Sequence, residues 1–213
     1  MKNRLTIIIG FIIFSLMNLN AQNINLGIKT GAGIAKTNFT NIPDIDSNSD
    51  IFSSNFSYSI NGTLNYRINQ LFGFSVEPGI IKQGWISNKE NNNENKINLY
   101  YFQLSSFLDF YLSDKLFFSI GPEVDYLVNA KNKTTSNSEE ITDLFRKFGL
   151  SGMTGITYNI FDIYDIGFKF SHGLTKISDE LLWVADDDIN TIKLRGYNQS
   201  FQFFIKFRIK NLR

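Results

Sequence analysis

From Phe56 to Ile68 the chain alternates between two kinds of residue without a break. Every even-numbered position carries an apolar residue or glycine, and every odd-numbered position carries a polar or charged one. An α-helix would space its apolar residues three and four positions apart, whereas the side chains of a β-strand point alternately to opposite faces. The segment is therefore predicted to be a strand with one apolar and one polar face.

The same alternation recurs in eight segments along the chain. Each is longer than the roughly five or six residues of a typical soluble strand. Each is also long enough to cross a bilayer, which takes about 9–11 tilted residues. The predicted strands are Ile24–Phe39, Ser54–Ile68, Leu71–Trp85, Ile97–Leu112, Lys115–Asn129, Phe145–Ile160, Ile163–Ile177 and Tyr197–Lys210.

The links between these segments alternate between short and long. The short ones are predicted turns at Asn69-Gln70, Ser113-Asp114 and Asn159–Asp162. The long, polar ones are Thr40–Ser53, Ile86–Lys96, Ala130–Leu144 and Ser178–Gly196. This pattern is typical of transmembrane barrels with brief periplasmic turns and long outer loops. We predict an all-β fold, an eight-stranded antiparallel up-and-down transmembrane β-barrel with both termini on the periplasmic side.

The size of the side chains decides which face points inward. A soluble lipocalin-like barrel also alternates, with its apolar residues inside. The apolar face here carries many large residues, such as Phe56, Phe102 and Phe110, whereas the other face is rich in glycine, serine, threonine and asparagine. An eight-stranded barrel is only just wide enough to be filled by side chains. The apolar face is therefore predicted to point outward into lipid.

Charged residues also recur on the predicted inner face. Buried charges must be paired or hydrogen-bonded, so we expect a balanced structural network across the lumen. A proton or ion path is the alternative, and an open solute pore is not expected because such pores belong to wider barrels. The predicted lumen residues are Lys29, Arg67, Glu77, Asp109, Glu123, Asp125, Asp165, Lys169, Lys206 and Arg208.

Tyrosines lie near both ends of the predicted strands. Membrane barrels carry an aromatic girdle at each interface of the bilayer. The predicted outer girdle contains Tyr58, Tyr100 and Tyr126, and the predicted inner girdle contains Tyr66, Tyr158 and Tyr164. The alternative is that strand ends are simply rich in aromatic residues.

The first 21 residues have the layout of a secretory signal peptide. Lys2 and Arg4 precede an apolar run from Leu5 to Met17, and Ala21 is a small residue at the predicted cleavage point. We predict a signal peptide over residues 1–21 and an outer-membrane β-barrel domain over residues 22–213. An uncleaved anchor helix is the alternative, but the run is shorter than the roughly 20 apolar residues that span a bilayer.

The composition excludes several kinds of chemistry. The chain has no cysteine, which rules out disulfides, cysteine nucleophiles and Cys-ligated metal sites. With 21 basic and 20 acidic residues it has no general affinity for nucleic acid. The run Asp44–Asp50 imitates the start of a calcium loop, but Ser49 and Asn55 replace the required glycine and glutamate. Like Asp186–Asp188, it is interpreted as a solvated acidic loop, and no metal, cofactor or catalytic residue is predicted.

His172 is the single histidine, and Ser171 precedes it. Outer-membrane barrels that modify lipid use a histidine with a serine and an acid, which makes a lipid-modifying enzyme an alternative function. The known deacylase pattern places the serine two residues after the histidine, where this chain has Leu174. We expect His172 to be a structural residue at the membrane interface.

The last outer loop contains a short apolar run. Exposed apolar patches often mark partner surfaces. The run is therefore a candidate contact for envelope or secretion proteins, and an extended hairpin above the membrane is the alternative. Its residues are Leu181, Leu182, Trp183 and Val184.

Several short motifs resemble, in their order and spacing, the PorT-like outer-membrane β-barrel family of Gram-negative bacteria, whose barrel is of the eight-stranded OmpX type. The resemblance covers essentially the whole chain after the leader and implies an outer-membrane barrel without common catalytic residues. The motifs are Asn25–Gly31, Ser75–Gly79, Lys82–Gly84, Tyr111–Leu116, Gly121–Glu123, Ser171–Ile177 and Ser200–Ile209.

We therefore expect a non-enzymatic barrel with a structural or interaction role, without a solute channel, in contact with outer-membrane lipid. The founding member of the resembling family is linked to protein secretion, so an accessory component of a secretion machine is the main alternative function.

Overall fold

The computed structural model describes residues 24–40, 52–88, 94–134, 137–178, 181–185 and 188–212. Eight long strands form the wall. They are β1 (Ile24–Thr40), β2 (Phe52–Arg67), β3 (Phe72–Asn88), β4 (Glu94–Tyr111), β5 (Leu116–Lys133), β7 (Phe148–Phe161), β8 (Tyr164–Gly173) and β10 (Asp188–Leu212).

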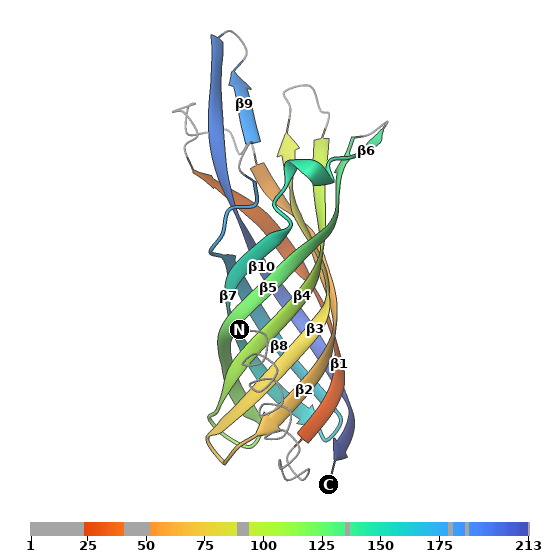
Figure 1. The fold of residues 1–213 in the computed structure, drawn as a ribbon. Helices are drawn as coiled ribbons and strands as arrows, with labels where there is room; N and C mark the ends of the chain where they lie inside the picture. The colour runs from red at the N-terminus through yellow and green to blue at the C-terminus, as the bar shows by residue number, and fades with distance from the viewer. Residues whose placement is uncertain are drawn as a thin grey trace, which may run out of the picture.

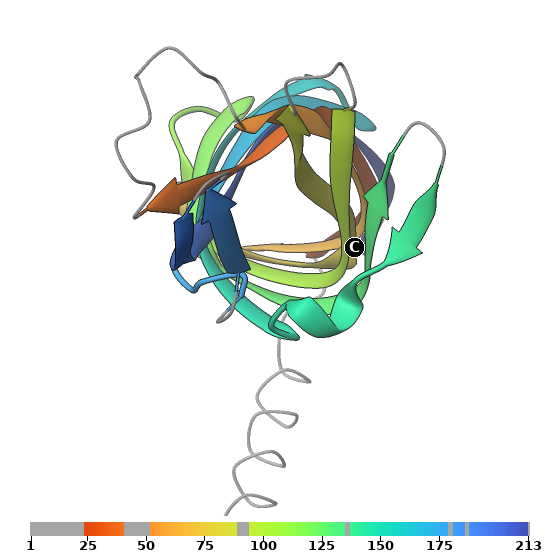
Figure 2. The same ribbon diagram turned by 90° about the horizontal axis from the view of Figure 1, so that it is seen from above.

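The wall closes on itself (Figure 1 and Figure 2). Each wall strand pairs antiparallel with the next, and β1 pairs with β10 along its whole length, from Ile24 beside Leu212 to Thr40 beside Arg195. The prediction of an eight-stranded antiparallel barrel is confirmed. No helix in the described ranges is long and apolar enough to cross a membrane.

Short turns gather at one end of the barrel, which we call the turn end. The amides of Ile68 and Asn69 both donate to the carbonyl of Phe72, and the side-chain oxygen of Asn69 accepts from the amide of Leu71. At the next turn the amide of Leu112 donates to the carbonyl of Leu116 at 2.9 Å. The first two short turns lie where predicted, whereas the third lies at Asp162-Ile163, because β7 continues to Phe161. β1 begins and β10 ends at this same end (Figure 1).

The opposite end, which we call the loop end, carries additional structure. Strand β6 (Ser138–Glu140) extends the sheet beside β5, the 3-10 helix η2 (Thr142–Leu144) follows it, and β9 (Leu181–Ala185) pairs with the upper part of β10. Several predicted strand boundaries are wrong here, and the largest error is at β10, which begins at Asp188 instead of Tyr197. The strand expected to begin at Phe145 begins at Phe148, and the one expected to reach Ile177 ends at Gly173.

The two faces of the wall are inverted relative to a soluble barrel. On β2 the apolar residues Phe56 and Ile60 are half exposed on the outside, whereas Ser57 and Ser59 between them are buried inside. Because large apolar residues cover the outside of every wall strand, the outer face matches a lipid-contacting surface. The prediction that the apolar face points outward is confirmed.

Candidate functional site: the filled lumen

Two buried ion pairs lie in the middle of the lumen, and each bridges two strands that are separated by one other strand of the wall. Lys29 on β1 pairs with Glu77 on β3, and Lys169 on β8 pairs with Glu123 on β5. All four side chains are almost completely buried. On the turn-end side of these pairs, Asp165 accepts from Arg208 at 2.7 Å and lies 3.6 Å from the ammonium of Lys206. Each pair joins strands that are far apart in the sequence.

Glu123 is the most enclosed member of this network, with no solvent exposure. One of its oxygens accepts from Lys169, from Gln103 and from the hydroxyl of Ser105, and the other accepts from the hydroxyl of Ser171 at 3.0 Å. Four donors from two strands, β4 and β8, thus surround one carboxylate. Such saturation is what allows a charge to remain in a site closed to water.

Two predicted lumen carboxylates lack a cation among the described residues. Asp109 accepts from the hydroxyls of Ser75 and Ser119, the latter at 2.6 Å. Asp125 accepts only from Ser151 at 3.4 Å, and its other oxygen is buried without a hydrogen-bond partner in the described part of the chain. Hydroxyl groups rather than cations therefore satisfy part of the inner charge.

Arg67 differs from the prediction. Its guanidinium lies at the turn end, where it donates to the carbonyls of Asn69 and Gln70, pairs with Asp114 at 3.2 Å and stacks over the ring of Tyr111. It is partly exposed to solvent and does not join the central pairs. The cause is local, since the β2–β3 turn presents its carbonyl oxygens next to this side chain.

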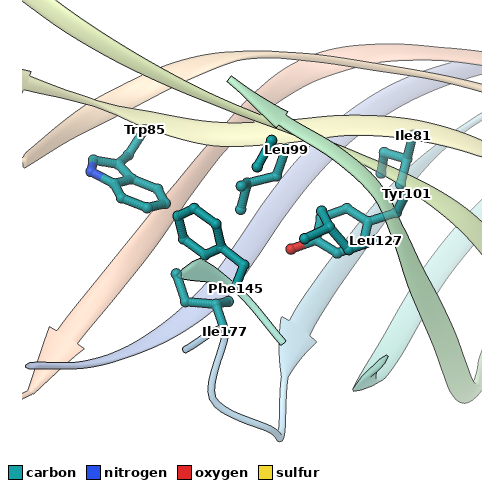
Figure 3. Close-up of a cluster of buried hydrophobic side chains, with 8 residues drawn as sticks. Ile81, Trp85, Leu99, Tyr101, Leu127, Phe145 and Ile177 are labelled. Carbon is teal, nitrogen blue, oxygen red and sulfur yellow. The ribbon is translucent and has the colours of Figure 1, made fainter. Parts of the chain in front are cut away.

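Above the ion pairs, toward the loop end, an apolar cluster fills the lumen (Figure 3). The ring of Trp85 lies 5.3 Å from that of Phe39 and 6.1 Å from that of Phe145, which folds inward from beyond η2. The hydroxyl of Tyr101 accepts from the side-chain amide of Asn198. The cluster consists of Ile81, Trp85, Leu99, Tyr101, Leu127, Ala130, Phe145 and Ile177.

This apolar plug was not predicted. A signal for it was present, because Ile81, Leu99, Tyr101 and Leu127 all fall at odd positions, which belong to the inner face in these strands. Lys82 is a further buried residue that was not predicted, because its even number places it on the apolar outer face. Its ammonium donates to the carbonyl of Phe56 at 2.8 Å, next to a register shift in the β2–β3 pair.

Ser171 and His172 lie on opposite faces of the wall. Ser171 points inward to Glu123, whereas the Nδ1 atom of His172 lies 2.7 Å from the side-chain nitrogen of Gln199 on β10. A hydrolytic triad needs its histidine within hydrogen-bond reach of its serine. Strand alternation keeps these two adjacent residues apart, so the hydroxyl of Ser171 serves the charge network.

The six girdle tyrosines all occupy the outward register. Tyr58, Tyr126, Tyr158 and Tyr164 are 40–45% exposed, and Tyr66 and Tyr100 are half-buried. The run Leu181–Val184 lies in β9, where Leu181, Leu182 and Trp183 pair in register with β10. The predicted signal peptide, the run Asp44–Asp50 and residues 186–187 lie outside the described residues.

Comparison with known proteins agrees with this architecture. Residues 20–179 match the family model described as outer membrane protein beta-barrel domain. Among solved structures, Neisserial surface protein A aligns with a TM-score of 0.51 at 14% identity, over 86% of this chain and 97% of that one. Ail of Yersinia pestis aligns with a TM-score of 0.46 at 14% identity, over 88% and 99% of the two chains. OprG of Pseudomonas aeruginosa aligns with a TM-score of 0.45 at 7% identity, over 89% and 98%. No match was found among the curated proteins.

Proposed function

Because this chain belongs to the outer membrane protein beta-barrel domain family, we propose that it is a closed barrel that acts through its surface and conducts no solute. It is an integral outer-membrane protein. We also propose that it is a PorT-like member of this family. The loop end faces outward from the cell, the turn end faces the periplasm, and the protein catalyses no reaction.

The filled lumen is the observation that carries this proposal. A molecule entering from the loop end meets the apolar plug of Trp85, Phe145 and their neighbours. Beyond it lie the buried pairs of Lys169 with Glu123 and of Lys29 with Glu77. Displacing either layer would expose apolar side chains or separate buried charges, and both are costly. Side chains alone thus close a barrel of this width.

Conductance measurements test the absence of a channel. We expect the purified protein in planar lipid bilayers to give no stable current steps above the bare membrane. A porin inserted under the same conditions is the positive control. Reproducible steps whose frequency rises with the amount of added protein would contradict a closed lumen.

Co-purification tests whether the protein has an interaction role. We expect a tagged barrel, extracted from outer membranes in mild detergent, to retain a protein in stoichiometric amount. We also expect the double variant Leu182→Ser/Trp183→Ser to lose it, because that run is the proposed contact. A Lys131→Gln variant is the control for loop-end changes elsewhere. Recovery of the barrel alone would contradict the role, and a partner from a protein-export complex would favour the secretion-accessory alternative.

A further inference from the structure

Three neighbouring strands change from apolar to polar side chains at the same rung of the outer face. On β1 the outward residues include Ile28 and Ile34 before Lys36 is reached. Gln199 on β10 lies directly beside Lys36, and His172 on β8 lies directly beside Gln199. Lys36, Gln199 and His172 therefore form a continuous row across β1, β10 and β8.

A second cation lies on the same face, closer to the loop end. Arg195 on β10 pairs in register with Thr40 on β1, four residues beyond Lys36, and both cationic residues are exposed. Within the described part of the chain, no acidic side chain forms an ion pair with either. We call Lys36, His172, Arg195 and Gln199 together the basic patch.

The height of the basic patch corresponds to the border of the membrane. On β8 the outward residues run from Tyr164 through Phe168 and Phe170 to His172. At about 3.3 Å per residue and a tilt of about 40°, these eight steps rise roughly 20 Å. The apolar band of membrane barrels is about 25 Å tall. The patch thus lies where hydrocarbon gives way to the headgroups of the outer leaflet.

The donors of the patch fit an anionic group. The side-chain nitrogen of Gln199 lies 2.7 Å from Nδ1 of His172, so this contact leaves Nε2 of the imidazole available to a ligand. Lysine and arginine supply the charge-assisted donors that phosphate oxygens prefer. On the opposite wall, Lys131 pairs in register with the exposed Glu140, and the exposed Glu139 pairs with Asn132 between Lys131 and Lys133, which gives that side mixed charge. We propose that the basic patch binds the phosphate-bearing headgroup of an outer-leaflet lipid.

Spin-labelled lipids test this site in the intact barrel. The full-length protein is reconstituted into phosphatidylcholine vesicles that contain a trace of spin-labelled phosphatidylglycerol or spin-labelled phosphatidylcholine. We expect labelled phosphatidylglycerol to associate with the surface of the wild-type barrel more strongly than labelled phosphatidylcholine. The ratio of the two association constants should fall at least about threefold in the double variant Lys36→Gln/Arg195→Gln. One basic residue near an anionic surface raises an association constant by about fivefold.

The matched control is Lys131→Gln/Lys133→Gln, which removes the same charge from the loop end of the opposite wall. The ratio of association constants measured for this control should stay within error of the wild-type ratio. The mobility of unboiled samples on gels checks that each variant is folded. An unchanged ratio in Lys36→Gln/Arg195→Gln, or an equal fall in the control, would overturn the site. Loss of the wild-type preference in inorganic phosphate, at an ionic strength matched with chloride, would assign the patch to free phosphate and also overturn the lipid proposal.

Discussion

Replacing Lys169 with methionine is expected to destabilise the barrel by about 3–5 kcal/mol, the cost of leaving a buried charge without its partner. Lys169 is the single cation that contacts Glu123 in the described part of the chain. Asp125, two residues further along the same inner face of β5, has no ion-pair partner there. The variant would therefore leave two neighbouring carboxylates in a closed lumen without a contacting cation.

Urea unfolding in lipid vesicles, followed by tryptophan fluorescence, measures this cost. The double variant Lys169→Met/Glu123→Gln should recover a large part of it, because it removes both charges of the pair. Asp114→Asn breaks the exposed pair with Arg67 and should change stability by less than about 1 kcal/mol. Equal losses of stability in Lys169→Met and Asp114→Asn would contradict the claim that burial makes the loss of an ion pair costly.

Replacing Trp85 with alanine is expected to cost about 3–5 kcal/mol, the usual penalty for truncating a large aromatic side chain in a core. Trp85 is 4% exposed, and its ring contacts the rings of Phe39 and Phe145. Phe145 belongs to the segment between η2 and β7 and not to a wall strand. Loss of its contact with Trp85 should therefore also loosen the segment around η2.

Gel mobility of unboiled samples across a urea series measures this loss without using the missing tryptophan. Trp85→Phe keeps an aromatic ring at the site and should lose less than half as much stability. Hydrogen exchange at the amides of Leu144 and Phe145, which donate to Ile141 and Thr142, should rise in Trp85→Ala. Wild-type stability in Trp85→Ala would show that the plug does not support the fold.

The wall could be predicted from the sequence because period-two alternation is a local signal. In β2 every residue from Phe56 to Leu64 takes the face that its position predicts. The ends of the strands could not be predicted in the same way. Phe145 and Ile177 fall at odd positions, out of step with the even-numbered apolar residues of their predicted strands. Both leave the wall and fold over the lumen, because the apolar plug offers them a buried site.

The sequence predicts that the lumen is filled and charged, but not how its side chains are layered or paired. The small side chains of the inner face as a whole predict a narrow, filled interior. They do not reveal that the layer near the loop end is apolar. The partner of each charge depends on strand register and stagger. Lys29, for example, reaches past β2 to Glu77 on β3, a choice that no spacing in the sequence determines.

The inward charges also restrict the order in which this barrel can be assembled. An open sheet that entered the bilayer strand by strand would present Lys29, Glu123 and Lys169 to hydrocarbon, where an unpaired charge is very costly. The edges of the sheet would carry unpaired amides and carbonyls as well. The seam between β1 and β10 joins residues as distant in the chain as Ile28 and Phe207. Insertion and closure of this seam must therefore occur together, with water or an assembly factor shielding the inner face until the last pair forms.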